Sequence, residues 1–209
     1  MIGRLRAALH REGLSFFSRR IQSLARRVAG YERVLVYGVP SGAPRPPADD
    51  SGASCVELAT PAEALAADAP WDAETLAARM GEGARLFAVR DDGAHTSFGW
   101  VTTAPSIWVG EVRRTLAVPR PLSWIWDCVT PDAFRGRGYY PRLLHQLREE
   151  FGDGSVIIYC RAQNAPSRRG ITKAGFVEVA SVMRIAGFVS VRSRGAAPER
   201  VGLGGKEPP

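Results

Sequence analysis

A strand, a glycine-rich loop, a helix and a second strand follow one another between residues 124 and 160. Trp124 to Thr130 and Ser155 to Cys160 are apolar runs of strand length, and Arg142 to Phe151 places its leucines on one helical face. Because a helix between two strands is the usual crossover that returns the chain to the same sheet, the two strands should run parallel. The sequence therefore predicts a central βαβ unit.

Weaker patterns on both sides of this unit predict the remaining elements. Strands are expected at Arg33–Tyr37, Cys55–Leu58, Arg85–Arg90, Ser97–Thr102, Trp108–Val118 and Phe176–Ile185, and helices from Pro61, over Ala73–Met80 and over Ala165–Ala174. The turn Asp91-Asp92-Gly93 predicts an antiparallel hairpin. A chain of 209 residues, 45% of them hydrophobic, has the size and core of one domain, so we expect an α/β (α+β) fold with a mixed, partly antiparallel sheet.

The two ends of the chain differ in composition from the domain expected over residues 31–190. Residues 2–28 place apolar side chains at three- and four-residue spacing with arginines between them, which predicts a basic amphipathic helix within an extension over residues 1–30. This helix is expected to pack on the domain or on a second copy of the chain. A weak contact with an anionic membrane surface and a targeting peptide stay open. Residues 191–209 are expected to be disordered.

Composition excludes several other classes. Cys55, Cys128 and Cys160 are far apart, so we interpret them as reduced core thiols that form neither a disulfide framework nor a metal site. No stretch approaches the ~20 consecutive apolar residues that cross a bilayer, and arginines interrupt every candidate signal sequence near the amino terminus. We therefore expect a cytoplasmic protein. The net charge of +7 is spread along the chain, and binding of nucleic acid is not expected.

The loop Phe134-Arg135-Gly136-Arg137-Gly138 lies between the first strand of the central unit and its helix. A turn at this place directs backbone N–H groups and the positive end of the helix dipole at one point, which attracts a pyrophosphate. The glycines allow a close approach of the backbone, and the arginines add positive charge. Tight turns also use glycine for steric reasons, so the loop alone does not define a phosphate site.

The order of motifs in this half of the chain resembles that of the GNAT superfamily of N-acetyltransferases. Arg135 and Gly138 fill the first and fourth positions of the motif Arg/Gln-x-x-Gly-x-Gly/Ala, whereas the sixth position, usually Gly or Ala, is Tyr140. Downstream, the runs Asn164-Ala165-Pro166-Ser167 and Lys173-Ala174-Gly175-Phe176 resemble the second signature of the superfamily. The resemblance covers about residues 55–188 and is sharp only from residue 124 onward.

The resemblance implies a GNAT-like fold with acetyl-CoA, or another acyl-CoA, as co-substrate and no metal. The two parallel strands would splay apart as a V that holds the pantetheine arm, with helices on both faces of the sheet. A strand irregularity near Cys128 and Val129 would free an N–H for the thioester oxygen, and the pyrophosphate would lie on loop amides. The cofactor-binding residues are thus expected to be Cys128, Val129, Arg135, Gly136, Arg137, Gly138, Tyr139, Tyr140, Asn164 and Ser167.

The catalytic residues follow less directly from the motifs. Asp127 is the carboxylate nearest the expected acyl position, and burial in an apolar strand would suit it to act as a base; a purely structural Asp is the alternative. Many relatives protonate the departing thiolate with a Tyr seven residues after the Asn, but Ile171 stands there. Tyr140, Tyr139 or Tyr159 would replace that Tyr, or water would protonate the thiolate. We assign catalytic roles to Asp127 and Tyr140.

The motifs predict transfer of an acetyl group to a primary amine by direct attack, and they leave the acceptor open among small molecules, amino sugars, peptides and proteins. A GNAT-like CoA-binding or regulatory module without turnover is the alternative, because the usual Tyr is missing. A third hypothesis is an adaptor that binds nucleic acid or a membrane through residues 1–30. The dinucleotide-binding fingerprint Gly-x-Gly-x-x-Gly fails, because position 141 is proline. Assembly as a homodimer stays open.

Overall fold

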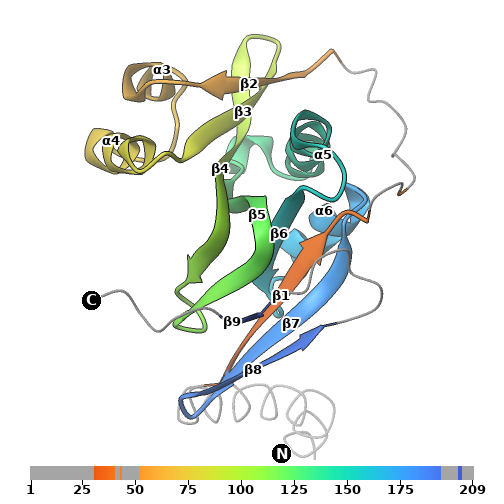
Figure 1. Cartoon of the computed structure of the whole chain (residues 1–209). Coiled ribbons are helices and arrows are strands. Elements are labelled where there is room, and N and C mark those ends of the chain that lie inside the picture. Colours follow the sequence, from red (N-terminus) through yellow and green to blue (C-terminus); the bar gives the residue numbers. More distant parts are fainter. Residues whose placement is uncertain (1–30, 41–42, 44–51, 194–201, 204–209) are drawn as a thin grey trace, which may run out of the picture.

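The computed structural model describes residues 31–40, 43, 52–193 and 202–203. This part of the chain forms one nine-stranded sheet in the order β2-β3-β4-β5-β6-β1-β7-β8, with β9 paired to β5 (Figure 1). The strands are β1 (Glu32–Gly38), β2 (Ser54–Leu58), β3 (Arg85–Asp91), β4 (Ala94–Val109), β5 (Arg114–Val129), β6 (Val156–Arg161), β7 (Val177–Ile185), β8 (Phe188–Ser193) and β9 (Gly202–Leu203). The helices are α3 (Pro61–Ala66), α4 (Ala73–Gly81), α5 (Tyr139–Phe151) and α6 (Ala165–Lys173), with a 3₁₀ turn at Asp132–Phe134. The helix predicted within residues 1–30 lies outside the described residues.

The central unit is β5, α5 and β6, and its two strands are parallel as predicted. They pair at three positions, of which the last joins Ile125 to Ile158. Beyond that pair β5 continues to Val129 and β6 to Arg161, and β6 stays paired with β1 on its other side. The two parallel strands therefore diverge, which is the V that the resemblance implies.

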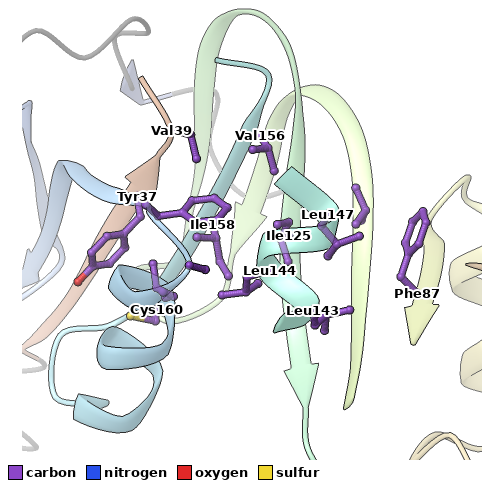
Figure 2. Close-up of a cluster of buried hydrophobic side chains, with 14 of the residues drawn as sticks. Tyr37, Val39, Phe87, Ile125, Leu143, Leu144, Leu147, Val156, Ile158 and Cys160 are labelled. Atoms are coloured by element: carbon purple, nitrogen blue, oxygen red, sulfur yellow. The ribbon is translucent and has the colours of Figure 1, made fainter. Parts of the chain in front are cut away.

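Helices cover both faces of the sheet. α5 packs its leucines Leu143, Leu144 and Leu147 on one face, beside α6 (Figure 2). On the other face, Leu76 of α4 packs with Leu86 of β3 in a separate apolar cluster. Neighbouring residues of a strand point to opposite faces, so each face has its own core.

A further apolar cluster lies on the face opposite α5 and joins the distal parts of β4 and β5 to β1, β6 and β7. Val34 and Val36 of β1 belong to this cluster, whereas Leu35 and Tyr37 of the same strand belong to the core under α5. The far end of the β4–β5 hairpin contributes Val109, Val112, Leu116, Val118 and Leu122. This cluster holds the hairpin against the second half of the sheet.

Several predicted boundaries are wrong. The segment Trp108–Val118 is not one strand: β4 ends at Val109, a turn follows, and β5 starts at Arg114. The predicted strand from Trp124 is only the second half of β5, a strand of 16 residues. A further strand that was not predicted, β8, follows the one that ends at Ile185 and extends to Ser193. Gly202–Leu203 also pairs with β5 inside the segment expected to be disordered, and residues 194–201 and 204–209 lie outside the described residues.

Candidate active site

A cavity of about 920 Å³ opens where β5 and β6 diverge. Its walls come from the end of β5, the loop after it, the first turn of α5, the end of β6 and the start of α6. The predicted site residues that line it are Asp127, Cys128, Val129, Arg135, Gly136, Gly138, Tyr139, Tyr140, Asn164 and Ser167. Arg137 is the one predicted residue that does not line this cavity. The structure thus brings the two sequence signatures to one place.

The loop from β5 to α5 has the backbone that its glycines permit. Gly136 and Gly138 have φ of 79° and 84°, which is the left-handed region that favours glycine. Gly138 is the N-cap of α5 and has no side chain to cap the helix, and Pro141 in the first turn has no N–H. The N–H groups of Tyr139 and Tyr140 are therefore left to face a ligand, together with the positive end of the helix dipole.

Side chains around the loop hold it in this shape. Arg135 donates from Nε to the carbonyl of Thr130 at 3.0 Å and forms an ion pair with Asp132 at 2.6 Å, so its guanidinium braces the loop. The hydroxyl of Tyr139 donates to Asp91 Oδ2 at 2.7 Å, which ties the first turn of α5 to the β3–β4 hairpin. This hydrogen bond is also the main reason that the pKa of Tyr139 is raised.

The strand irregularity implied near Cys128 is present as a β-bulge. β5 pairs with β4 at Trp126 and again at Val129, and the two residues between them face the single residue Gly99. Asp127, the first of these two, has a φ of 43°, a conformation that Asp tolerates better than most residues. A bulge leaves backbone groups outside the ladder, so it can direct an N–H of this segment into the cavity.

Asp127 is not the buried carboxyl that its apolar strand predicts. Its side chain is 38% exposed, and its Oδ2 accepts hydrogen bonds from Arg79 at 2.7 Å and from the indole N–H of Trp71 at 3.0 Å. Arg79 itself lies over the rings of Trp71, Trp100 and Trp126, at 4.8 to 5.5 Å from their centroids. The carboxylate is therefore held from one side by α4 and the segment before it.

Tyr140 fills the space between α5 and α6. A Cβ at Gly170 would overlap its ring, so α6 carries glycine where the helices meet. The Tyr140 hydroxyl and Ser167 Oγ are 3.1 Å apart, and the side chain of Asn164 accepts from the Ser167 N–H as the N-cap of α6. Ile171, at the position of the usual Tyr, is fully buried in the core. Tyr140 is thus the phenol that lies between the two signatures.

Burial makes the phenols and thiols of the cavity weaker acids than they are in water. The pKa of Tyr140 is raised well above its usual value and that of Tyr159 is also raised, in both cases mainly by burial. Burial raises the pKa of the Cys128 thiol to about 12 and also raises that of Cys160. At neutral pH these groups are protonated, so they can donate hydrogen bonds but do not supply a thiolate nucleophile.

Several lining residues escape prediction from the sequence. They include Arg79, Glu111, Thr130, Ile158, Cys160 and Arg161. Arg79 comes from α4 and Glu111 from the turn between β4 and β5, and neither lies in a motif. Thr130 and the β6 residues adjoin the motifs, and the period-two alternation of strands is the signal that could have assigned them to a wall.

The described residues include no cluster of three or more side chains that could hold a metal ion. In the part of the chain with assigned structure, no helix has both the length and the apolar character needed to cross a membrane.

Comparison with protein-family models and with curated proteins finds no match. Solved structures do resemble the chain. A putative GNAT-family acetyltransferase from Novosphingobium aromaticivorans matches with 18% identity over 79% of this chain and 66% of its own, at a TM-score of 0.48. A GNAT-family acetyltransferase from Colwellia psychrerythraea matches with 14% identity over 78% and 57%, at 0.49. A conserved protein of unknown function from Staphylococcus epidermidis matches with 9% identity over 78% and 65%, at 0.51.

This chain therefore spans less than two thirds of the length of these structures, at 66%, 57% and 65%. At such identities the likeness concerns the fold alone. The fold itself is GNAT-like: two parallel strands splay around a cavity, a glycine-rich loop leads from the first into a helix, and helices cover both faces of the mixed sheet.

Replacing Gly99 tests how tightly the bulge is packed. A Cβ at this position would lie 3.0 Å from Leu143 Cδ2 and 3.1 Å from Cys128 Sγ, so Gly99→Val should lower the free energy of unfolding by about 1–3 kcal/mol. Gly81→Val is the control, because its Cβ would meet no atom within 4 Å apart from its chain neighbours and the backbone of its own helix, and it should stay within about 0.5 kcal/mol of the wild type. Urea denaturation measures both, and equal stabilities would contradict the packing described.

Alkylation tests the protonation state of Cys128. Because its pKa rises from 9.0 to about 12 on folding, its thiolate fraction at pH 8 falls, and the labelling rate should climb with pH up to that value. Iodoacetamide at pH 8 should modify Cys128 at least about 100-fold more slowly in the native protein than in the urea-unfolded chain. Peptide mass spectrometry gives the rate at this residue, and similar rates in both states would show that the thiol is not shielded.

Proposed function

We propose that this protein is an acyl-CoA-dependent N-acyltransferase that transfers the acetyl group of acetyl-CoA to a primary amine. The observation that carries this proposal is the position of the cavity. It extends from the uncapped N-terminus of α5 into the gap between β5 and β6, so one continuous space offers amides for a pyrophosphate and free strand edges for an amide-bearing arm.

The donor is assigned to the α5 side of this cavity. The pyrophosphate is held by the N–H groups of the loop and of Tyr139 and Tyr140, and the pantetheine amides pair with the backbone of Cys128 and Val129. Arg135 contributes mainly by bracing the loop. Arg137, which lies outside the cavity lining, contributes charge at its rim. The bulge brings an N–H to the thioester oxygen, where it stabilises the negative charge of the transition state.

The acetyl group passes directly to the amine without a cysteine-bound intermediate. Cys128 lines the cavity, but a thiol whose pKa is raised to about 12 provides too little thiolate to attack a thioester at neutral pH. The amine nitrogen therefore attacks the carbonyl carbon, the new C–N bond forms, and the C–S bond breaks with release of the thiolate of CoA.

Two side chains are assigned to the proton movements of this reaction. Asp127 takes up the amine proton, directly or through a water molecule, and it can do so through Oδ1 because its described hydrogen bonds use Oδ2. Tyr140 donates a hydrogen bond to the departing sulfur. Its raised pKa makes full proton transfer to the thiolate unfavourable, so the thiolate gains its proton from solvent after release. The free thiols of the chain suit a reducing compartment such as the cytoplasm.

A module that binds CoA without turnover is the second candidate. The buried Ile171 at the position of the usual Tyr favours it, because no hydroxyl can reach the cavity from there. Release of free CoA thiol from acetyl-CoA in the presence of a broad amine panel separates the two candidates. Binding of acetyl-CoA with no amine-dependent thiol release would support the second candidate.

Acetyl-CoA should stabilise the wild-type protein in a thermal unfolding assay, by about 2.7 kcal/mol at a ligand concentration of 100 Kd. Gly138→Val should abolish this stabilisation, because the side chain enters the cavity at the N-cap of α5. Gly152→Val is a control at the other end of the same helix: its φ of 81° is also positive and its ψ of 153° makes the backbone at least as strained for valine, and it lies outside the cavity lining. A ligand-induced shift retained in Gly138→Val and lost in Gly152→Val would refute the assigned pyrophosphate site.

Tyr140→Phe should lower kcat about tenfold or more with little change in KM for acetyl-CoA, because a hydrogen bond to a charged sulfur is lost only as the charge develops. Tyr139→Phe is the control, since its hydroxyl is used by Asp91, and its kcat should fall less than that of Tyr140→Phe. Steady-state rates of thiol release give both constants. Equal losses in the two variants would remove Tyr140 from the reaction.

A further inference from the structure

Residues from both faces of the sheet line the cavity. Ile158 and Cys160 of β6 belong to the core under α5, whereas Tyr159 between them packs against the apolar cluster on the opposite face. Trp126 of β5 packs against that same cluster. All four side chains line the cavity, so the gap between β5 and β6 passes through the sheet. A donor bound beside α5 leaves the opposite opening for the second substrate.

The opposite opening is walled by four charged side chains, two of each sign. Asp127 pairs with Arg79 at 2.7 Å, and Glu111 pairs with Arg161 Nε at 3.5 Å. Arg161 follows Cys160 in β6 and therefore points to the same face as Tyr159. Glu111 and Asp127 both act on the hydroxyl of Tyr159, because each raises its pKa in addition to burial. The two carboxylates thus lie near one phenol, and Arg79 lies over the indole of Trp126.

The two ion pairs differ in how firmly they are held. Arg79 is fixed by its contacts with three indole rings and by a short hydrogen bond, so it stays with Asp127. Arg161 has a side chain that is 54% exposed and sits at the longer distance from Glu111. Such a pair contributes little to stability and exchanges readily for other partners. Arg161 and Glu111 are therefore the charges that a ligand can engage.

The balance of signs selects the kind of ligand. A simple cation placed among these side chains would be attracted by Glu111 and repelled by Arg161, and a simple anion would meet the reverse. A molecule that carries both charges satisfies both residues at once, because its carboxylate forms paired hydrogen bonds with a guanidinium and its ammonium approaches a carboxylate. The aromatic rings of Trp126 and Tyr159 then contact the apolar part of the molecule.

We propose that the acceptor is an amino acid with a free carboxylate, bound through Arg161 at its carboxylate and through Glu111 at its ammonium, so that the amine faces Asp127 and the acyl position. This inference rests on the proposed acetyl transfer. It assigns Arg161 and Glu111 to acceptor recognition, and it excludes acceptors whose carboxylate is blocked, such as an internal lysine of a protein.

Matched acceptors test the need for a carboxylate. L-Leucine, L-leucinamide and isoamylamine share one side chain and differ at the carboxyl group, as do L-phenylalanine, L-phenylalaninamide and phenethylamine. For the full chain with acetyl-CoA, the free acid of a series should give a kcat/KM at least about tenfold above those of its amide and amine, since one charge-assisted contact of this kind is expected to change the rate by that factor. Amides or amines that react as well as the acids would overturn the proposal.

Variants at Arg161 test the residue itself. R161M should lower kcat/KM for the acids about tenfold and leave kcat/KM for the amides unchanged. This loss removes the preference for the free acid over its amide, and R161K should restore part of that preference. R90M is the matched control, because Arg90 is an exposed arginine of β3 outside the cavity lining, and it should keep the preference of the wild type. An unchanged preference in R161M would overturn the proposal.

Binding measurements separate this inference from the proposed function. Thermal stabilisation by acetyl-CoA reports the donor site alone, and additional stabilisation by L-leucine or L-phenylalanine in the presence of CoA reports the acceptor site. Amino acids that neither react nor stabilise the CoA complex would overturn the acceptor assignment, even if acetyl-CoA binds and other amines react. Absence of any stabilisation by acetyl-CoA would instead overturn the proposed function.

Discussion

Where two parallel strands diverge, their backbone N–H and C=O groups lose their partners in the sheet. Buried groups of this kind must form hydrogen bonds with other partners. In this protein the pairing of β5 and β6 stops at Ile125 and Ile158, although both strands continue for several residues. The outer neighbours β4 and β1 remain paired and keep the diverging strands extended. The gap is thus a fixed property of the sheet, and a ligand that carries amides along its length is the natural complement to it.

Elements distant in the sequence keep the gap open. The bulge at Asp127 is held from one side by Arg79 of α4 and is packed from the other against Gly99 and Leu143. Tyr140 spans the space between α5 and α6 because Gly170 makes room for its ring. These contacts link helices on both faces of the sheet to the end of β5, so the geometry of the proposed oxyanion contact depends on packing on both faces.

Local patterns predict the parts of this structure that are made locally. The βαβ unit, the glycine-rich loop that leads into α5 and the helix from Ala165 follow from residue types at short spacing, and the structure confirms them. Arg79 and Glu111 could not be predicted, because they reach the cavity only through tertiary packing and neither spacing nor composition marks them. The prediction that Asp127 is buried was wrong for the same reason, because its surroundings are set by tertiary packing.

Predicted strand boundaries were wrong where the hydrophobic pattern of the sequence is ambiguous. The long β4–β5 hairpin carries prolines and an irregular register near Ala104, so its two arms look like shorter separate strands in the sequence. The position of β1 in the sheet also cannot be predicted from sequence patterns. β1 is the first strand among the described residues; it enters the sheet between β6 and β7, antiparallel to both, and pairs Val34 with Arg161 and with Val182.

That position of β1 has a consequence for biosynthesis. During translation the apolar segment Val34-Leu35-Val36-Tyr37 is made more than a hundred residues before the two strands that flank it in the sheet. In the nascent chain this apolar segment stays unpaired until those strands are made. The delay slows folding and leaves the segment open to self-association or to binding by chaperones. In a circularly permuted chain in which this segment follows β8, both strands that flank it in the sheet would be synthesised before it.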